Sequence, residues 1–300
     1  MSFTSELYMH KVWRTQKQMK VLALFLISGA YAFAQDQTAI EVKPSMPVIQ
    51  DKDLWERTGL FHPFKRMPRF VARDQAQIWT SPIHTARSDI KWWAIFGGAT
   101  IALVATDRWT VQQLPNSSSQ VSVSNWASRL GSAYSLIPVS AGFYLIGSKR
   151  HDERFRETGL IAFETLIDAQ ITVAAIKMIA DRARPTEGDG RGRFLDSQNG
   201  RWNSSFPSGH AVTTWALASV IAHEYPKPLV KIVAYGLAST VVVARVGARR
   251  HFPGDVMAGA GIGWFMGDYI FGKRHNRSLD RKPSRVRNIL DHVEIGASIQ

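Results

Sequence analysis

Apolar residues gather in six segments of this chain, and polar stretches rich in glycine, proline and charged residues separate them. The segments cover about residues 92–106, 130–147, 158–180, 209–223, 229–245 and 255–272. They consist mainly of Ala, Val, Ile, Leu and small residues, without the alternation of apolar and polar positions that marks half-buried strands. This pattern predicts an all-α protein whose core is a bundle of six helices.

The length and the charges of these segments are compatible with either a membrane-embedded or a soluble bundle. Several are 15 to 18 residues long, which is marginal because a membrane-spanning helix needs about 20 residues. They also carry Glu164, Asp168, Lys231 or Asp268, and charged side chains are costly inside a membrane. We expect a membrane-embedded bundle, although helices lying side by side in a soluble bundle would give the same pattern.

Residues 1–34 have the three parts of a secretory signal peptide. Four basic residues lie between positions 11 and 20, an apolar run extends from Val21 to Ile27, and Ala32-Phe33-Ala34 precedes Gln35. We expect cleavage after Ala34. An uncleaved anchor helix is the alternative, but the apolar run is short for a membrane span.

The remaining chain divides into a lead-in, one domain and a tail. Residues 35–89 are expected to be a polar lead-in whose prolines interrupt any long helix, namely Pro44, Pro47, Pro63 and Pro68. Apolar positions at helical spacing predict a short surface or membrane-interface helix over residues 70–80. The helical domain covers residues 90–272, with a loop of turn-forming residues at 115–120, and residues 273–300 form a basic tail.

The composition of the chain limits the classes of molecule that it is expected to bind. The chain has 300 residues, 45% of them hydrophobic, a formal charge of +13 and no cysteine. The basic excess favours an anionic membrane or a phosphorylated substrate, and not nucleic acid, because no dense basic segment with interleaved aromatic residues is present. The absence of cysteine excludes disulfides and thiolate metal ligands.

Three short polar clusters lie where apolar segments begin or end. They are residues 177–185 (KMIADRARP), 207–210 (PSGH) and 245–255 (RVGARRHFPGD). Three helix ends could bring their cations, histidines and serine around one small volume. That composition suits a tetrahedral oxyanion, because cations, free helix N-terminal amides and hydroxyls all stabilise one.

The first two clusters supply binding groups and a proton donor. Lys177 and Arg184 are seven residues apart, so we expect them on one helix face, and Pro185 should end that helix. Ser208 and Gly209 open the next helix, whose N-terminus attracts anions, and His210 in its first turn could protonate a leaving group. Each cluster alone is equally compatible with a solvated helix end or an ordinary capped helix start.

The third cluster adds a nucleophile. His251 and Asp255 are four residues apart around a helix start, so the carboxylate could accept from one imidazole nitrogen and leave the other free to attack. Arg245 would be a further phosphate clamp. A lone His–Asp pair is more often structural, but three clusters in this order favour one site.

The set Lys-x6-Arg-Pro, Pro-Ser-Gly-His and Arg-x5-His-x3-Asp resembles the signature of the type 2 phosphatidic acid phosphatase superfamily, which includes bacterial acid phosphatases and vanadium haloperoxidases. The resemblance covers about residues 90–272 and implies a helical bundle whose phosphatase chemistry needs no metal. It also implies roles for eight residues: phosphate binding by Lys177, Arg184 and Arg245, hydrogen bonds from Ser208 and Gly209, attack on phosphorus by His251, orientation of His251 by Asp255, and protonation of the leaving oxygen by His210.

One position departs from the family pattern. A serine often precedes the arginine of the third motif, and Ala244 stands there in this chain. A hydroxyl contact to phosphate is lost as a result. Arg249 or Arg250 could replace that contact or meet a substrate head group, and a solvated loop is the simpler account of at least one of them.

Three functions are compatible with these motifs. We expect metal-independent hydrolysis of a phosphomonoester or pyrophosphate, most readily a lipid phosphate, through a phosphohistidine. The alternatives are a haloperoxidase that holds vanadate with the same residues and a lipid-binding membrane protein without catalysis, which would not need both histidines. The Gly-rich loop over residues 186–205 could cover a substrate or be a plain linker.

Charge placement predicts a bacterial inner-membrane protein with its site facing the periplasm. The loop 148–157 and the tail 273–287, with seven Lys or Arg against one Asp, are cytoplasmic by the positive-inside rule. The three clusters then lie on the opposite side. A cleaved signal peptide followed by six full spans would instead place them inside, so these two inferences conflict.

Overall fold

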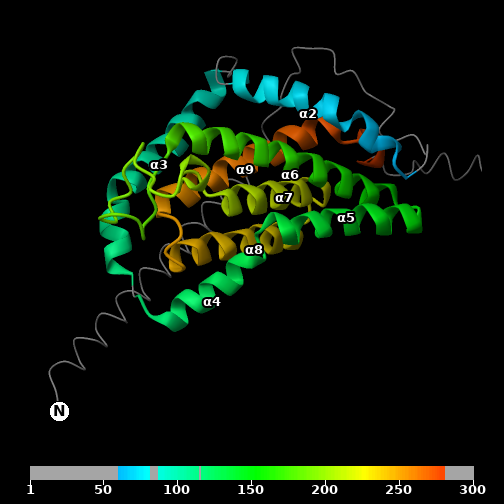
Figure 1. The fold of residues 1–300 in the computed structure, drawn as a ribbon. Helices are drawn as coiled ribbons and strands as arrows, with labels where there is room; N and C mark the ends of the chain where they lie inside the picture. Colours follow the sequence, from blue (N-terminus) through cyan, green and yellow to red (C-terminus); the bar gives the residue numbers. More distant parts are fainter. Residues whose placement is uncertain (1–59, 82–86, 115, 281–300) are drawn as a thin grey trace, which may run out of the picture.

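The computed structural model describes residues 60–81, 87–114 and 116–280, and these residues form helices and no strand (Figure 1). The predicted signal peptide, most of the lead-in and the end of the basic tail lie outside the described residues. The helices are α2 (His62–Thr80), α3 (Arg87–Gln113), α4 (Ser118–Arg129), α5 (Ala133–Arg150), α6 (Glu153–Ala180), α7 (Gly209–Glu224), α8 (Pro228–Gly247) and α9 (Pro253–Arg274). The all-α fold is confirmed, and the six predicted segments correspond to α3 and α5 to α9.

The helix predicted over residues 70–80 is present, but it is longer than expected, and Pro63 and Pro68 do not interrupt it. Helix α2 begins at His62 and not near residue 70, with Pro63 in its first turn and Pro68 inside it. A first-turn proline needs no hydrogen-bonded N–H, and α2 compensates for Pro68 by burying Met67, Phe70 and Ile78. The packing of this helix on the bundle therefore outweighs the local effect of Pro68.

The predicted loop at 115–120 is shorter than expected. Helix α4 starts at Ser118, and the Ser117 hydroxyl accepts a hydrogen bond from the Gln120 amide at 3.3 Å, which caps the helix. The side chain of Gln120 donates to the carbonyl of Gly247 at the end of α8. Polar residues that usually form turns are helical here because α4 packs along α8.

Helix α7 is the centre of the bundle. It contacts α5, α6, α8 and α9, and Figure 1 shows it running between its neighbours. Nearly every residue from Ala211 to Val220 is buried, which explains why this helix is apolar on all sides. Its start, the PSGH cluster, is therefore held by the surrounding helices.

Glycines allow α7 and α9 to approach closely. A Cβ added at Gly263 would lie 2.2 Å from the Val212 carbonyl oxygen, and one added at Gly267 would lie 2.5 Å from the Ala216 oxygen. The two glycines are four residues apart on one face of α9, the arrangement of small residues that lets helix backbones meet. No side chain fits between the helices at these positions.

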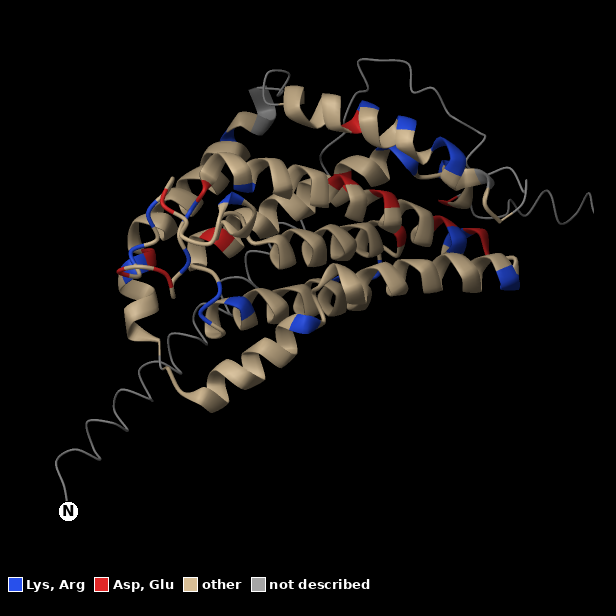
Figure 2. Ribbon diagram, in the orientation of Figure 1, with Lys and Arg blue, Asp and Glu red and all other residues tan. Residues whose placement is uncertain are grey.

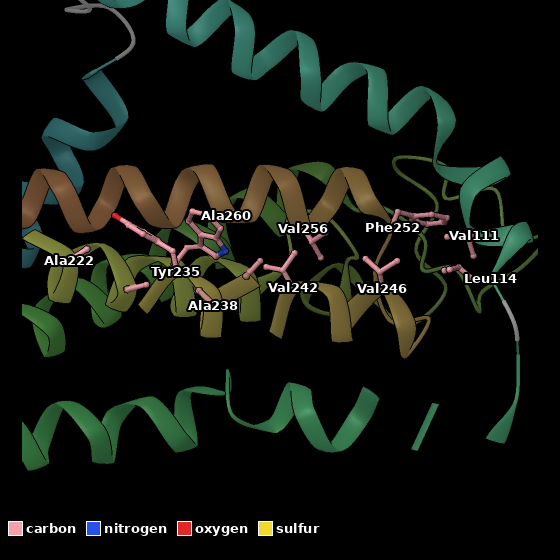
Figure 3. Close-up of a cluster of buried hydrophobic side chains, with 13 residues drawn as sticks. Val111, Leu114, Ala222, Tyr235, Ala238, Val242, Val246, Phe252, Val256 and Ala260 are labelled. Atoms are coloured by element: carbon pink, nitrogen blue, oxygen red, sulfur yellow. The ribbon is translucent and has the colours of Figure 1, made fainter. Parts of the chain in front are cut away.

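Branched side chains fill the space between α8 and α9. Figure 3 shows Val242, Val246 and Val256 packed together there, and Phe252 beside Val111 and Leu114 from the end of α3. This apolar cluster extends up to the loop that carries the third polar cluster. The loop is consequently anchored by Phe252, which is fully buried.

Charged residues gather at the two ends of the bundle, and long stretches of helix between them carry none (Figure 2). Three stretches are long and apolar enough to cross a membrane: Ser118–Arg150, Glu153–Ala180 and Pro228–Gly247. Large apolar side chains on them are exposed, among them Ile171, Ile179 and Leu237. Such a surface is characteristic of contact with lipid.

The predicted basic tail begins inside the bundle. Helix α9 continues to Arg274, two residues past the expected domain end at 272. Lys273 and Arg274 both form ion pairs with Asp74 of α2, and Arg274 also pairs with Glu164 of α6 at 2.7 Å. The first tail residues thus connect α2 to the bundle, at the end opposite to the three polar clusters.

The close contact between α7 and α9 makes a stability prediction. We expect Gly263→Val to push the helices apart and lower the free energy of unfolding by about 1–3 kcal/mol, the usual cost of overpacking. Thermal unfolding in detergent, followed by circular dichroism, measures this loss. Gly272→Val on the same helix is the control, since no atom lies within 4 Å of the added Cβ; equal losses in both variants would contradict the proposed contact.

Candidate active site

The three polar clusters meet at one end of the bundle, where α6 and α8 end and α7 and α9 begin. The amide of Ser208 before α7 donates to the Asp255 carbonyl at 3.0 Å, which joins the second and third clusters. The Lys177 amine donates to the carbonyl of Ser204, in the loop that leads to the second cluster, and the charges of Lys177, Arg184 and Arg245 act on His210. The predicted convergence on one volume is therefore present in the structure.

Helix α6 ends earlier than its sequence suggested. Its last residue is Ala180, and Asp181 adopts a left-handed conformation with φ 43°. Pro185 is therefore not the residue that ends the helix, and Arg184 lies in the following loop. Lys177 and Arg184 do not share a helix face as predicted; one approaches the site from the helix and the other from the loop.

Backbone carbonyls of the neighbouring loops position Arg184. Its Nε donates to the Asn203 carbonyl at 2.9 Å and its Nη1 to the Arg250 carbonyl at 3.5 Å. Residues 181–208 are packed against the site, with the Ser204 hydroxyl accepting from the Arg182 amide at 2.8 Å. Residues 186–205 are thus a folded part of the site's surroundings and not a plain linker.

Two buried donors at the site have no hydrogen-bond partner among the described residues. They are the hydroxyl of Ser208, which is fully buried, and Nε of Arg245, whose Nη1 donates to the Ser128 hydroxyl at 3.2 Å. An unsatisfied buried donor costs about 1–3 kcal/mol. The site therefore offers donors that an oxyanion would satisfy.

His251 is buried, and its ring is oriented by a backbone carbonyl. Nδ1 lies 2.8 Å from the carbonyl oxygen of Ser205, so it carries the proton and donates, which leaves Nε2 with a free lone pair. The nearest Asp255 oxygen is 3.8 Å from Nδ1, too far for a hydrogen bond. The predicted direct bond from the imidazole to the Asp255 carboxylate is therefore absent.

Asp255 acts on His251 through Ser205. One carboxylate oxygen accepts from the Ser205 hydroxyl and, at 2.8 Å, from the Phe252 amide. The other accepts from Arg182 Nη1 at 2.6 Å. Asp255 thereby fixes the residue whose carbonyl holds the His251 ring.

Arg182 is a site residue that the sequence reasoning missed. Its guanidinium bridges two buried carboxylates, with 2.6 Å from Nη1 to Asp255 and 2.9 Å from Nη2 to Asp107 of α3. It also lies over the Phe252 ring, 4.5 Å from the centroid. The only sequence signal was its place within the first motif, because the partner Asp107 is far away along the chain.

Asp107 extends this network to the start of α9. One of its carboxylate oxygens accepts from the Gly254 amide at 2.8 Å. Burial raises the pKa of Asp107 to about 6, although Arg182 opposes the rise. The carboxylate therefore depends on Arg182 to stay ionised at neutral pH.

The two histidines are both neutral at pH 7. Burial lowers the pKa of His251 to about 4, with the Asp255 carboxylate opposing and Arg245 adding to the fall. Burial also lowers the pKa of His210 to about 3, helped by the charges of Arg245 and other nearby cations. Neutral His251 is ready to act as a nucleophile, whereas His210 needs an anion in the site to offset the cations before it can hold a proton.

The two arginines before His251 have different environments. Arg249 has a left-handed backbone, and its Nη1 lies 3.2 Å from the Leu114 carbonyl, so it is engaged at the end of α3. Arg250 is exposed. Ala244, at the position of the family serine, is buried. Burial lowers the pKa of Arg184, and the charge of Arg250 lowers it further. The charge of Arg250 also acts on Arg245, so Arg250 lies near the site's cations.

Comparisons with known proteins agree with the family resemblance that the three motifs predicted. Residues 158–278 match the family model of the PAP2 superfamily, so the predicted resemblance is confirmed for a segment that contains all eight predicted site residues. Curated lipid A 1-phosphatases are similar over shorter stretches. The protein of Porphyromonas gingivalis is 34% identical over 67 residues, 22% of this chain and 15% of the relative.

Two further relatives are lipid A 1-phosphatases of Rhizobium johnstonii and Rhizobium etli. Each is 31% identical over 110 residues, which is 36% of this chain and 44% or 47% of the relative. The chain therefore aligns with less than half the length of these proteins. Among solved structures, a transmembrane PAP2 type phosphatidylglycerolphosphate phosphatase from Bacillus subtilis aligns with a TM-score of 0.44 and 20% identity, over 73% of this chain and 100% of that one.

The network around Arg182 predicts a large loss of stability when its charge is removed. Arg182→Met leaves Asp107 and Asp255 buried without their shared cation, and breaking a buried ion pair costs about 3–5 kcal/mol. Chemical denaturation in detergent measures the change. Arg193→Met is the control, because Arg193 pairs with Asp189 on the surface and exposed pairs contribute about 0–1 kcal/mol. Equal midpoints for the two variants would show that the bridge contributes no stability.

Proposed function

We propose, on the premise that residues 158–278 are a PAP2 superfamily domain, that this protein is a phosphatase that hydrolyses a phosphomonoester or pyrophosphate. The observation that carries the proposal is the pair of unsatisfied buried donors, Ser208 Oγ and Arg245 Nε, beside a neutral His251 with a free Nε2. Lys177 and Arg184 add positive charge at the same place. This combination supports binding a phosphoryl group and attacking it.

The proposed reaction has two steps. The phosphoryl oxygens bind Lys177, Arg184 and Arg245, with further hydrogen bonds from Ser208 and from Gly209 at the helix start. His251 Nε2 then forms a bond to phosphorus while the bond from phosphorus to the leaving oxygen breaks. A proton from His210 goes to that oxygen. Water next attacks the phosphohistidine, gives its proton to His210 and releases inorganic phosphate with His251 free again.

Asp255 is proposed to position the nucleophile and not to touch the substrate. Its carboxylate holds the Ser205 hydroxyl, and the Ser205 carbonyl accepts the proton of His251 Nδ1. This arrangement keeps Nε2 directed toward phosphorus in the correct tautomer. None of these steps requires a metal ion.

We infer that the substrate is a lipid phosphate. Three stretches can cross a membrane, and the site lies at the ends of two of them, α6 and α8. The similar Rhizobium proteins are lipid A 1-phosphatases, which act on a phosphorylated membrane lipid. We place the protein in the bacterial inner membrane with this end facing the periplasm, because the basic residues of the loop 148–157 and of residues 273–280 lie at the other end. Exposed Arg250 is available to meet an anionic head group.

A phosphate-release screen tests the proposal. Purified protein in detergent, with EDTA present and at a temperature well below unfolding, should release phosphate from at least one of lipid A 1-phosphate, phosphatidate, phosphatidylglycerophosphate and undecaprenyl pyrophosphate. His251→Ala should lose all turnover, since the covalent route is gone. His223→Ala is the control, because His223 lies at the other end of α7. Normal turnover by His251→Ala would contradict the proposed nucleophile, and phosphate release only from a soluble aryl ester would contradict the proposed lipid substrate.

The proposed proton donor makes a separate prediction. His210→Ala should slow hydrolysis of an alkyl phosphate by about 10²–10⁴-fold, the usual range for general acid catalysis. Hydrolysis of a nitrophenyl phosphate should fall much less, because nitrophenolate leaves without a proton. Single-turnover rates for both substrates measure the contrast. An equal loss with both leaving groups, or a phosphohistidine trapped on His210, would assign the acid role elsewhere.

A further inference from the structure

A second cluster of chemically reactive side chains lies at the end of the bundle opposite to the phosphate site. Glu157 is in the second turn of α6, Glu224 is the last residue of α7, and His275 directly follows α9. Each offers one ligand atom, and these atoms all lie within 4.8 Å of one another. Figure 2 shows acidic residues gathered at this end of the helices. Three helices that form the phosphate site at one end thus meet again at the other.

The two carboxylates are buried without enough hydrogen bonds. Glu157 and Glu224 are both 0% exposed. Neither carboxylate oxygen of Glu224, nor Oε2 of Glu157, has a hydrogen-bond partner among the described residues. An ionised carboxylate buried in this way is strongly unfavourable unless a cation binds it. Glu157 Oε1 is the exception, since it accepts from the Asn276 amide at 2.6 Å and forms a hydrogen bond with His275 Nδ1 at 3.0 Å, a bond that metal binding would replace.

The nearest arginine pairs with Glu224 but makes no hydrogen bond to its carboxylate oxygens. Arg154 Nη1 is 3.6 Å from Glu224 Oε1, beyond hydrogen-bonding distance. Its own donors are used elsewhere, on the backbone carbonyls of Glu224 and Leu279 and on Asp280 at 2.9 Å. Glu224 and Asp280 thus share one arginine, and Glu157 pairs with His275, so among the described residues the carboxylates outnumber the permanent cations around His275.

His275 has the surroundings of a metal-binding histidine. Its Nδ1 faces the carboxylates, 3.0 Å from Glu157 Oε1 and 3.6 Å from Glu224 Oε2. Its Nε2 lies 2.7 Å from Asp280, which Arg154 holds in place. Histidines that bind metals usually donate their other ring N–H to a carboxylate in this manner.

We propose that Glu157, Glu224 and His275 bind a divalent transition-metal ion of the zinc class, with Asp280 orienting the histidine. One imidazole nitrogen and two carboxylates form a mixed N/O set that suits Zn²⁺ better than Mg²⁺ or Ca²⁺, which prefer oxygen ligands alone. The ion would fasten the ends of α6, α7 and α9 together. It takes no part in phosphate chemistry, which is at the opposite end of these helices.

A second acidic cluster in the bundle does not have the same properties. Asp74, Glu164 and Asp168 also lie close together. Lys273 and Arg274 already form ion pairs with Asp74, and Arg274 pairs with Glu164. These cations already pair with two of the three carboxylates, and no histidine belongs to that cluster. The Glu157 cluster is therefore the one that fits a transition metal.

Metal binding by the whole protein tests the proposal. Full-length protein in detergent is depleted with a chelator, freed of the chelator, incubated with Zn²⁺ and separated from unbound metal. We expect about one Zn²⁺ per chain by elemental analysis and a higher midpoint of thermal unfolding than in the depleted protein. Co²⁺ should give visible absorption bands of a site with N and O ligands.

Variants distinguish this site from adventitious binding. Glu224→Gln and His275→Gln should lose the bound Zn²⁺ and its stabilising effect, while His223→Gln, a neighbouring histidine of α7, should keep both. Asp280→Asn changes a half-exposed residue whose loss should not unfold the chain, and it should weaken Zn²⁺ binding by about 10–100-fold. Hydrolysis of an aryl phosphate by folded Asp280→Asn should stay normal, which separates this test from that of the proposed function.

Two results would overturn the proposal. One is wild-type protein that retains no Zn²⁺ or Co²⁺, since the cluster would then be an ion-pair network around a protonated His275. The other is equal metal content in wild type and Asp280→Asn together with equal content in Glu224→Gln. If the Glu224 or His275 variants do not fold, the metal contents of the wild-type protein and of Asp280→Asn decide whether the site exists.

Discussion

The buried bridge from Arg182 to Asp107 and Asp255 is the interaction on which the site depends. It connects the loop after α6 with α3 and with the first turn of α9, all within the bundle interior. Two carboxylates and one guanidinium at this depth are tolerated because Arg182 forms an ion pair with both carboxylates and backbone groups form hydrogen bonds with all three side chains. The Asp255 carboxylate then holds Ser205, and Ser205 holds the His251 ring. The orientation of the proposed nucleophile therefore follows from an ion pair that never meets the substrate.

The close approach of α7 and α9 fixes the positions of the residues at both ends of these helices. Gly263 and Gly267 leave no space for side chains between the two helices, so their starting points keep a fixed separation. The starts of these helices carry His210 and the segment from His251 to Asp255. Their other ends carry Glu224 and His275. The same helix pair therefore positions the phosphate site at one end and the proposed metal cluster at the other.

The apolar middle of the bundle separates these two polar ends. Large apolar side chains are exposed along the stretches that can cross a membrane, and charged residues collect beyond them (Figure 2). A lipid phosphate bound at one end would keep its acyl chains beside this apolar surface, since exposing the chains to water would be unfavourable. The site's donors would then meet only the phosphoryl group at the membrane surface.

The sequence by itself determined the helical fold and most of the residues that belong to the proposed phosphate site. Long runs of apolar residues without alternation are typical of helices. The three motifs could be recognised because the proposed phosphate chemistry requires particular residue types at short spacings. Lys177, His210 and His251 could be identified for that reason. Local patterns also described the start of α7 well, although the Ser208 side chain makes no capping hydrogen bond there.

Only the tertiary structure decided how these residues are held. Arg182 and Asp107 are distant in sequence, and nothing local distinguishes a buried arginine from the solvated ones beside it. The 3.8 Å gap between His251 and Asp255, and the role of the Ser205 carbonyl, depend on how a loop folds against α9. Helix α2 persists through Pro68 because packing on the bundle outweighs local propensity. Hydrogen bonds and ion pairs across the bundle join residues that the chain separates, so their partners are set by packing and not by neighbouring sequence.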